Sequence, residues 1–516
     1  MDRTVCELFA GVGGFRCGLN GIRMPGDMKV GERRSMEEEH PMEEKWRTVW
    51  FSQWEPAEKK TQYAHDCYVY HFGTCLDSAG QDTTNVNIEE VDKSRIPDFN
   101  LLVGGFPCQD YSVASSLATS KGLEGKKGVL WWSIREVLEV KRPPFVLLEN
   151  VDRLLKSPAS QRGRDFGVML ACFRDEGYTV EWRVINAADY GLPQRRRRTF
   201  LFACREDTAY CGRQERATGY ECMEGRSSIE EGRSKEEKHS TEGRLSIEEG
   251  RSKEERHSMQ KGRSEADEEV RRASAAAGIS REGFFARTFP VDSVEPGQIK
   301  VGELPASLGE LSASFRFGFE NAGMMKDGVI YTAKTVPAYQ GKRLTLGDIM
   351  EQGDVEETYF IPEERLYYTS PEVTRSDETR ERLSREQRNT WQYLKGAKKL
   401  LRKAANGHSY VFSEGAIPMV DECDKPARTM LTSEGSFSRT THIVKDKKTG
   451  RIRLLTAGET ERIQGFPTDH TKYCLTGGKV VEMPLNKRRF MMGNALVVGL
   501  VERMGETLEK IFAEED

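Results

Sequence analysis

Short apolar runs, separated by stretches with helical spacing, dominate the first 204 residues of the chain. Runs of this length, bounded by glycine or polar residues, predict buried strands; they are 3–9, 48–54, 98–105, 145–149, 182–186 and 199–204. Apolar residues recur at helical spacing between them, for example at 131–141 and 163–176. Strands that alternate with helices predict an α/β fold, here with a parallel sheet covered by helices on both faces.

Two charged segments interrupt this pattern. Residues 24–45 have no periodic apolar face and are expected to form a solvated loop insertion. The second charged segment contains a repeat. Its first copy begins at Glu224 and reads EGRSSIEEGRSKEEKHST, and a near copy begins 18 residues later at Glu242. Repeats so short and so rich in Glu, Lys, Arg and Ser do not bury a core. We therefore expect disorder or a loose helical spacer over roughly 210–272.

The remainder of the chain regains apolar content. Residues 285–444 carry aromatics and glycine turns in short, irregular alternation, which predicts a smaller mixed domain. Residues 452–467 have helical spacing, and 488–513 read as a turn into a closing amphipathic helix. The predicted division has four parts: a first domain at 1–204, a charged linker at 205–284, the mixed domain at 285–444, and a final segment at 445–516.

Charge and cysteine usage exclude several classes of protein. The 516 residues carry 78 Lys and Arg against 82 Asp and Glu, a net charge of −4, so any nucleic-acid-binding surface must be local. No stretch is long and apolar enough to span a membrane, and the N-terminus has no signal-peptide apolar region. The 11 cysteines are scattered without a CxxC pair, which favours reduced cytosolic thiols over a disulfide framework or a zinc site.

A glycine-rich turn follows the first predicted strand. Glycines there allow backbone amides to approach a ligand at the start of a helix; the candidates are Phe9, Gly11, Val12, Gly13 and Gly14. A tight strand–helix turn without a ligand is the alternative. An acid at the end of the second strand holds ribose hydroxyls in nucleotide-binding folds, and Glu55 is placed there unless it is a plain surface acid.

Two further residues fit a nucleotide-type ligand. Trp54 is either a stacking surface for adenine or a core residue. Asp82 is either an acceptor for the adenine amino group or a turn residue.

Candidate chemistry lies at the ends of three later strands. Cys108, next to Pro107, follows the strand at 98–105; a thiolate there needs a positive setting, which the arginines at 195–198 offer. A lone cysteine is more often a small buried hydrophobe. Glu149 ends a buried strand, where a charge is costly unless functional or paired, and it suits a proton donor that Asn150 orients.

Strand alternation sorts the four arginines of 195–198. It points Arg196 and Arg198 to one side of the strand and Arg195 and Arg197 to the other. A charge run is usually a solvated face or a phosphate-binding patch. Four arginines that enter a buried strand also suit the polarisation of a base carbonyl.

Together these motifs resemble the cytosine-5 DNA methyltransferase family. The similar segments occur in family order: FAGVGGF, GGFPCQDYS, LLENV, YGLPQRRRRTFLFA, LTAGETERIQGFP and FMMGNALV. They cover about 1–204 and 445–516. The resemblance implies a Rossmann-like methyltransferase domain, completed by the C-terminal segment, with a target-recognition domain at 285–444.

The resemblance also implies a mechanism. Cys108 attacks carbon 6 of a cytosine, Glu149 contacts ring nitrogen 3, Arg198 contacts the base carbonyl, and Arg196 supports the Cys108 loop. Carbon 5 then takes a methyl group from S-adenosylmethionine. The base is flipped out of double-stranded DNA, and residues 109–127 close over it. The implied cofactor residues are Phe9, Gly11, Val12, Gly13, Gly14, Trp54, Glu55, Asp82, Pro107, Asn494 and Ala495.

Some points remain open at this stage. The 24–45 insertion and the repeats depart from the family pattern, and the ribose-binding acid is either Glu55 or displaced to the position of Gln53. RNA is an alternative substrate, and a noncatalytic DNA-binding protein is another alternative. Within the recognition domain, 428–442 suits phosphates or guanine edges, or is a plain surface loop, and 395–403 suits phosphates.

Several expectations follow from the family alone. They are a monomer in a bacterial or archaeal cytosol and a partner restriction endonuclease that acts separately.

Overall fold

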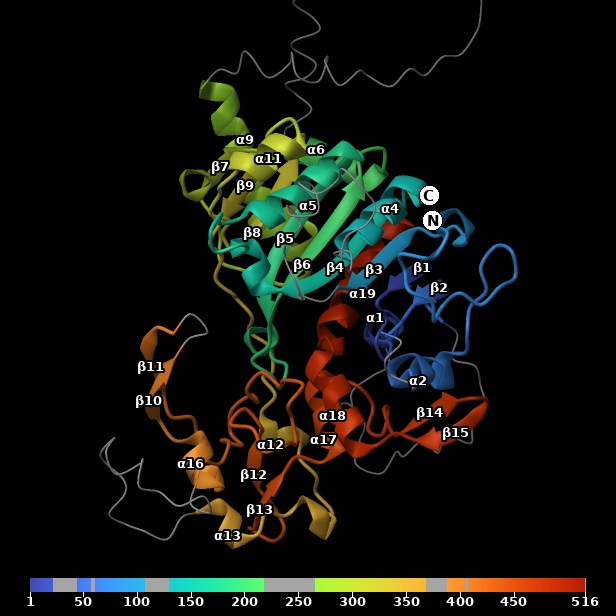
Figure 1. Ribbon diagram of the computed structural model, residues 1–516. Helices are drawn as coiled ribbons and strands as arrows, with labels where there is room; N and C mark the ends of the chain where they lie inside the picture. Colours follow the sequence, from blue (N-terminus) through green and yellow to red (C-terminus); the bar gives the residue numbers. More distant parts are fainter. Residues whose placement is uncertain are drawn as a thin grey trace, which may run out of the picture.

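The computed structural model describes residues 1–21, 44–56, 61–106, 130–217, 265–367, 388–403 and 407–515. Most of the 24–45 insertion lies outside the described residues, as do Pro107, Cys108, the 109–127 segment and the 18-residue repeats. The described part forms a large sheet covered by helices and a second body of small elements, drawn in the upper and lower halves of Figure 1.

A nine-stranded sheet organises the chain, in the order β2-β1-β3-β4-β6-β5-β8-β9-β7. Its parallel part is made of β1 (Thr4–Leu8), β2 (Arg47–Ser52), β3 (Leu101–Gly105) and β4 (Phe145–Val151). These four strands coincide with predicted apolar runs, and they are almost wholly buried. The α/β class expected from the sequence is confirmed.

The sheet is mixed and not parallel throughout, which corrects the sequence-based expectation. Strand β6 (Arg197–Arg205) runs antiparallel to both β4 and β5 (Tyr178–Asn186). The connection between β5 and β6 contains only the short 3-10 helix η3 (Ala187–Tyr190). A parallel return needs a dozen or more residues, usually with a helix, so this short connection turns the chain back.

Three more strands lengthen the sheet beyond β5. They are β7 (Lys300–Glu303), β8 (Ala322–Lys326) and β9 (Val329–Ala333). The turn between β8 and β9 is Asp327-Gly328, both with positive φ, the sequence that two-residue hairpins favour. These strands fall inside 285–444, so the expected domain boundary at 285 lies within one continuous sheet.

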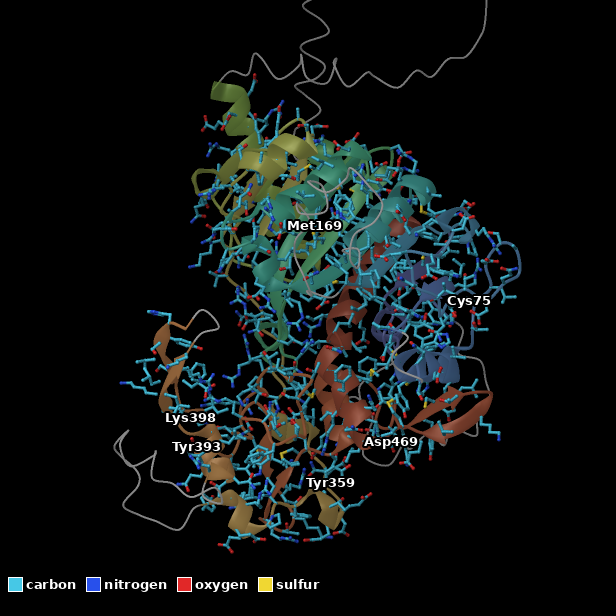
Figure 2. All side chains as sticks on the ribbon, viewed as in Figure 1. Cys75, Met169, Tyr359, Tyr393, Lys398 and Asp469 are labelled. Carbon is cyan, nitrogen blue, oxygen red and sulfur yellow. The ribbon has the colours of Figure 1, made fainter. Side chains whose placement is uncertain are left out.

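Helices cover both faces of the sheet, as predicted. One face packs on α4 (Trp131–Lys141) and α5 (Arg164–Asp175), and the other packs on α1 (Gly14–Leu19) and α19 (Val498–Ala513). Met169 of α5, labelled in Figure 2, is fully buried in the first of these layers. Gly18 lies so close to α19 that a Cβ there would fall 2.6 Å from Val501 Cβ. The C-terminal helix is therefore part of the first domain, beside α1 (Figure 1).

The described ends of the predicted spacer are helices, which agrees with the helical alternative, although these helices pack on the sheet and are not loose. Helix α6 (Ala209–Ala217) buries Tyr210 and Cys211 against β6. Helix α9 (Glu265–Ala277) packs beside β9. The charged repeats themselves lie between the two helices, outside the described residues.

The second lobe comprises 346–367, 388–403 and 407–466. It contains α12 (Leu346–Ile349), α13 (Glu363–Leu366), α16 (Trp391–Lys395), the hairpin β10 (Lys398–Lys403) and β11 (Ser409–Glu414), the hairpin β12 (Ile443–Lys445) and β13 (Ile452–Leu454), and α17 (Ala457–Gln464). The segment 452–467, expected to be helical, therefore begins as a strand.

The remaining elements connect the lobes or lie at the edges of the sheet. They are α2 (Tyr63–Phe72), α10 (Phe284–Thr288), α11 (Leu308–Ser314), α18 (Leu485–Asn494), and the hairpin β14 (Tyr473–Thr476) and β15 (Lys479–Glu482). Residues 488–494, expected as a turn, are the end of α18.

Candidate active site

The glycine-rich turn has two different glycines at its centre. Gly11 and Gly13 both have positive φ, +59° and +87°, as does Phe9. A Cβ on Gly13 would lie 2.5 Å from the Phe72 ring, whereas a Cβ on Gly11 would meet nothing within 4 Å. Gly13 therefore serves packing. Gly11 leaves its backbone facing open space, which is what close approach of a ligand requires.

A buried carboxylate lies at the start of the helix that follows the turn. Glu7 of β1 accepts a hydrogen bond from the Tyr68 hydroxyl at 3.0 Å, and the backbone N–H groups of Phe15 and Arg16 at the start of α1 act to lower its pKa. Burial raises the pKa of Glu7 to about 7, although these hydrogen bonds and the Arg16 charge oppose the shift. Sequence analysis did not single out Glu7; an acid inside an apolar strand is the signal that marks it.

The end of β2 lies next to the turn. Gln53 accepts a hydrogen bond from the backbone N–H of Gly11 at 2.7 Å. Trp54 is 37% exposed, so it does not fill the core, and one of its two expected roles is excluded. The backbone N–H of Glu55 donates to Gln62 at 2.7 Å. Gln53, one of the two positions considered for the ribose-binding acid, therefore contacts the turn through its side chain.

Asp82 belongs to the same edge of the sheet. Its carboxylate accepts from the Thr74 hydroxyl at 2.5 Å and from the Thr84 hydroxyl at 2.6 Å, and the Thr84 carbonyl in turn accepts from the Gln53 N–H at 2.9 Å. Burial raises the pKa of Asp82, but the bonds from Thr74 and Thr84 outweigh it, and the pKa lies below its usual value. Asp82 is thus ionised, and its side chain is exposed.

The C-terminal segment reaches the turn from the other side. A Cβ on Gly14 would lie 3.0 Å from Leu496 Cγ. Asn494, exposed, ends α18, and Ala495 follows it half-buried. The structure therefore brings residues 9–14, 53–55, 82 and 494–495 to the same edge of the sheet.

Glu149 and Arg198 form an ion pair where β4 ends and β6 begins. Arg198 Nε lies 2.7 Å from Glu149 Oε1, and the two side chains are 17% and 12% exposed. The register of β4 and β6 sets Val151 opposite Arg198, so the pair is a diagonal neighbour contact across the two strands. A Cβ on Gly105 would lie 3.3 Å from the Glu149 carboxylate, so the acid leans toward the end of β3.

Asn150 anchors the segment that leads to Cys108. Its side-chain amide donates to the Phe106 carbonyl at 3.1 Å, and its side-chain oxygen accepts from the Val151 N–H at 2.8 Å. Phe106 is the last residue before Pro107 and Cys108, which lie outside the described residues. The chain thus leaves β3 toward Cys108 from a point fixed to the strand that carries Glu149.

The alternation predicted for the four arginines is confirmed. Arg195 and Arg197 are exposed, Arg198 is half-buried, and Arg196 is 1% exposed. Arg196 donates to the carbonyls of Met430 and Gly493, at 3.0 and 3.1 Å. Burial, together with the Arg198 charge, lowers the pKa of Arg196 to about 9. Within the described residues, Arg196 therefore joins the sheet to the second lobe and to α18, and its support of the Cys108 loop stays a prediction.

Several cations expected to contact DNA are used inside the second lobe. Arg428 pairs with Asp421 through two contacts of 2.6 and 3.1 Å. Lys395 is 1% exposed and donates to the Thr441 carbonyl at 2.8 Å. Lys398 donates to the Leu394 carbonyl at 2.9 Å and its ammonium lies 5.0 Å from the Tyr393 ring centroid (Figure 2). Arg428 and Lys395 therefore hold the 428–442 segment from within, whereas Lys398 packs on α16.

Among the described helices, none has the length and apolar character needed to cross a bilayer.

Comparison with known proteins places the chain in one group. Residues 3–308 and 314–510 match the family described as C-5 cytosine-specific DNA methylase. The type II methyltransferase M.Sau3AI of Staphylococcus aureus is 37% identical over 512 residues, 98% of this chain and 95% of that protein. Two others match over 201 residues, 39% of this chain: M.NgoBI of Neisseria gonorrhoeae, at 33% identity over 50% of its length, and M.HhaI of Haemophilus parahaemolyticus, at 27% identity over 49%.

Proposed function

This chain belongs to the C-5 cytosine-specific DNA methylase family, and on that premise we propose which of its residues perform the reaction. The enzyme is a DNA (cytosine-5-)-methyltransferase that uses S-adenosylmethionine. The observation that carries our assignment is the Glu149–Arg198 ion pair, held at 2.7 Å beside the point where the chain turns toward Cys108. In open α/β sheets, ligands bind outside the carboxyl ends of the parallel strands, where this pair lies.

The proposed cofactor pocket lies at the turn after β1. Open space at Gly11, the exposed ring of Trp54 and the ionised Asp82 fit a nucleoside with a ribose and an adenine amino group. When bound, S-adenosylmethionine supplies an electrophilic methyl group. Trp54 stacks on the adenine, Glu55 accepts from the ribose hydroxyls, and Gln53 holds the Gly11 amide in place. The pocket is completed by Phe9, Val12, Gly13, Gly14, Pro107, Asn494 and Ala495.

In the proposed reaction Cys108 activates the cytosine. Its thiolate forms a bond to carbon 6, and the electron pair of the carbon 5–carbon 6 double bond moves to make carbon 5 nucleophilic. After methylation, loss of the carbon 5 proton restores that double bond and expels the thiolate. The target base must leave the duplex for this attack, since its ring is unreachable inside the stack.

Glu149 and Arg198 act on the flipped ring in this proposal. The Glu149 carboxyl hydrogen-bonds or protonates ring nitrogen 3, which draws electron density away from carbon 6. The Arg198 guanidinium donates to the base carbonyl, where negative charge develops during attack. Arg198 already contacts Glu149, so one ion pair fixes both groups before the base enters.

A separate surface suits the DNA duplex. On one face of the β10–β11 hairpin, exposed Lys399, Leu401 and Lys403 lie opposite Ser413, Val411 and Ser409. Leu401 and Val411 are 75% and 63% exposed, and this face carries no acid. Lysines bind phosphates, and a two-stranded ribbon fits the major groove, where apolar side chains contact thymine methyl groups. We assign DNA contact to this face, within a target-recognition region that starts after β9.

The biological role is proposed from the relatives. Since M.Sau3AI is a type II methyltransferase and matches nearly the whole chain, we propose that this enzyme methylates one short double-stranded sequence. The methylation protects bacterial DNA from a separate restriction endonuclease, and the enzyme acts as a monomer in the cytosol. The recognition surface on β10–β11 favours duplex DNA over RNA, because a duplex RNA major groove is too narrow to admit side chains.

A mechanism-based trap tests the role of Cys108. A duplex that carries 5-fluorocytosine at the target position has no carbon 5 proton to lose, so elimination stops and the protein stays bonded to carbon 6. We expect a denaturation-resistant complex between this duplex and the wild-type enzyme in the presence of S-adenosylmethionine. Cys108→Ser should give no such complex while it still binds the cofactor. A covalent complex with Cys108→Ser would contradict the assignment.

A further inference from the structure

A buried cluster beside the cofactor turn has no part in the proposed chemistry. Cys67 and His71 lie on α2, His470 follows α17, and their potential ligand atoms fall within 4.8 Å of one another. The His71 and His470 rings are stacked, with 4.2 Å between centroids and 4° between planes. A metal ion lies in the plane of an imidazole that binds it, because the nitrogen lone pair lies in that plane. Two parallel planes share no point, so this arrangement does not suit a shared metal ion.

The hydrogen bonds of the cluster lead to the cofactor turn. His71 Nε2 donates to the His470 carbonyl at 2.5 Å, and His470 Nε2 donates to the Val12 carbonyl at 2.8 Å. The acceptors are carbonyls, so each ring carries its proton on Nε2. Burial and the neighbouring His71 lower the pKa of His470 to about 3. His470 is therefore a neutral hydrogen-bond donor, and its acceptor is the carbonyl of Val12, the residue after Gly11.

The segment that carries His470 is held rigidly on both sides. The backbone N–H groups of Asp469 and Thr471 donate to the two carboxylate oxygens of Glu461, at 2.6 and 2.9 Å. Arg488 of α18 contacts both Glu461 and Asp469 at 2.9 Å, and Figure 2 labels Asp469 beside that helix. The Phe466 ring also stacks on His470, with 4.7 Å between the ring centroids. A buried ion pair thus fixes the position from which His470 reaches the turn.

We propose that His470 is a positioning residue for S-adenosylmethionine binding, which acts by holding the Val12 carbonyl and thereby the open backbone at Gly11. This inference rests on the proposed cofactor pocket. Val12 is 3% exposed, so its carbonyl has no access to bulk water if His470 is lost, and an unpaired buried carbonyl is costly. The turn then relaxes to find another donor, and the amides that face the ligand move with it.

Two substitutions separate the hydrogen bond from the packing. His470→Phe keeps a flat ring between His71 and Phe466 but has no donor, whereas His470→Gln keeps a donor at the reach of Nε2. We expect His470→Phe to weaken S-adenosylmethionine binding about 10-fold, measured by calorimetry on the DNA-free protein, and His470→Gln to restore most of that loss. The turnover number at saturating cofactor should stay within about 2-fold of wild type for both.

The outcomes distinguish the inference from the proposed pocket. Wild-type affinity for the cofactor in His470→Phe would overturn the positioning role, and so would an equal loss in His470→Phe and His470→Gln, which indicates packing alone. Failure of the wild-type protein itself to bind S-adenosylmethionine would contradict the proposed pocket instead. Should His470→Phe not fold, His470→Asn supplies a second variant, because its shorter amide does not reach Val12.

Discussion

The sheet and the second lobe are stabilised by different interactions. In the sheet, alternate residues of each strand enter two apolar layers; Val5, Leu101 and Phe145 face α19, and Cys6, Leu102 and Val146 face α4 and α5. In the second lobe, the separate apolar cluster has three buried members, Leu366, Trp391 and Ile443.

Buried charges add to the apolar contacts of that lobe, where residues such as Met430, Val444 and Ile463 belong to the same apolar cluster as α19. Arg453 pairs with Glu459 at 2.7 Å and with Asp446 at 3.0 Å, and all three side chains are almost fully buried. His442 pairs with Glu434 at 2.8 Å in equal burial. Backbone register therefore positions the proposed catalytic pair Glu149 and Arg198, whereas an ion pair between the side chains of Arg428 and Asp421 positions the 428–442 segment of the proposed target-recognition region. The two regions should fail in different ways.

The largest effect is expected in the sheet and on the reaction alone. Glu149→Gln should lower the methylation rate about 1000-fold, because it removes a group that exchanges a proton with the base. The loss should appear in the single-turnover rate with S-adenosylmethionine binding and thermal stability nearly unchanged. Asp152→Asn, which alters an exposed partner of Arg197 nearby, is the matched control and should retain activity. A Glu149→Gln rate within about 5-fold of wild type would refute the role.

In the second lobe, one substitution should lower the stability of the fold. Arg453→Met leaves Glu459 and Asp446 buried without their partner and should cost about 3–5 kcal/mol of unfolding free energy. Denaturant unfolding measures the loss, and DNA binding should weaken while S-adenosylmethionine binding persists. Arg451, two residues before Arg453, pairs with Glu357 at the surface, and Arg451→Met should change the unfolding free energy far less, because exposed ion pairs are screened by solvent. Equal effects of the two substitutions would erase the contrast between the lobes.

The lobes should also respond oppositely to pH. Burial raises the pKa of Asp446, but bonds from Thr449 and Arg453 outweigh it and set that pKa at about 2. A lowered carboxyl pKa contributes stability above the unfolded value near 4, and this stability is lost as the pH falls toward 2. Asp446→Asn should reduce this loss of stability at low pH, measured as the unfolding free energy over a series of pH values.

Glu7 has the reverse sign in the sheet. Its pKa is raised by burial to about 7, so the folded state keeps a proton that the unfolded chain releases above about 4.5. The Glu7 contribution to stability should therefore fall as the pH rises from about 4.5 to 7. Glu7→Gln should remove this pH dependence of the unfolding free energy between about 4.5 and 7, and the loss of stability at low pH due to Asp446 should remain. An unchanged slope in Glu7→Gln would assign it to another group.

The smallest effect is expected at the surface of the second lobe. Replacing Lys399 and Lys403 with alanine should reduce DNA affinity several-fold and lower the salt dependence of binding by about two phosphate contacts. Stability should not change, since both side chains are exposed. Binding titrations at several salt concentrations measure the slope. Lys479→Ala, on the exposed strand β15, is the control, and an equal change there would indicate a nonspecific charge effect.

More of the sheet than of the second lobe could be predicted from the sequence, for a physical reason. Buried strands such as Phe145–Val151 contain apolar runs that can be recognised in the sequence, and the candidate functional motifs lie at the ends of these runs. Strands β7–β9 were missed because they are short and join the sheet through β8, which pairs with β5 more than 100 residues away in the sequence. The antiparallel direction of β6 was missed because chain direction depends on the length of one connection.

Side-chain partners were the least predictable part of the site. The charges of Arg428, Lys395 and Arg196 suggested contact with DNA or with the Cys108 loop, and nothing local indicates that they bind Asp421, Thr441 and Met430 instead. The contacts of Gln53 and His470 with the cofactor turn were likewise not predicted, although Gln53 itself was considered, since each residue meets its partner across a long stretch of chain. Such contacts are set by the fold and not by neighbours in sequence.

The central claim is tested most directly by base-resolution methylation sequencing of plasmid DNA from a methylation-free host that expresses this chain. The account predicts 5-methylcytosine at one position of one short motif with the wild-type protein, and unmodified plasmid with Cys108→Ser or Glu149→Gln at equal protein levels. Unmodified plasmid from folded wild-type protein would contradict it, and so would methylation that persists in Cys108→Ser.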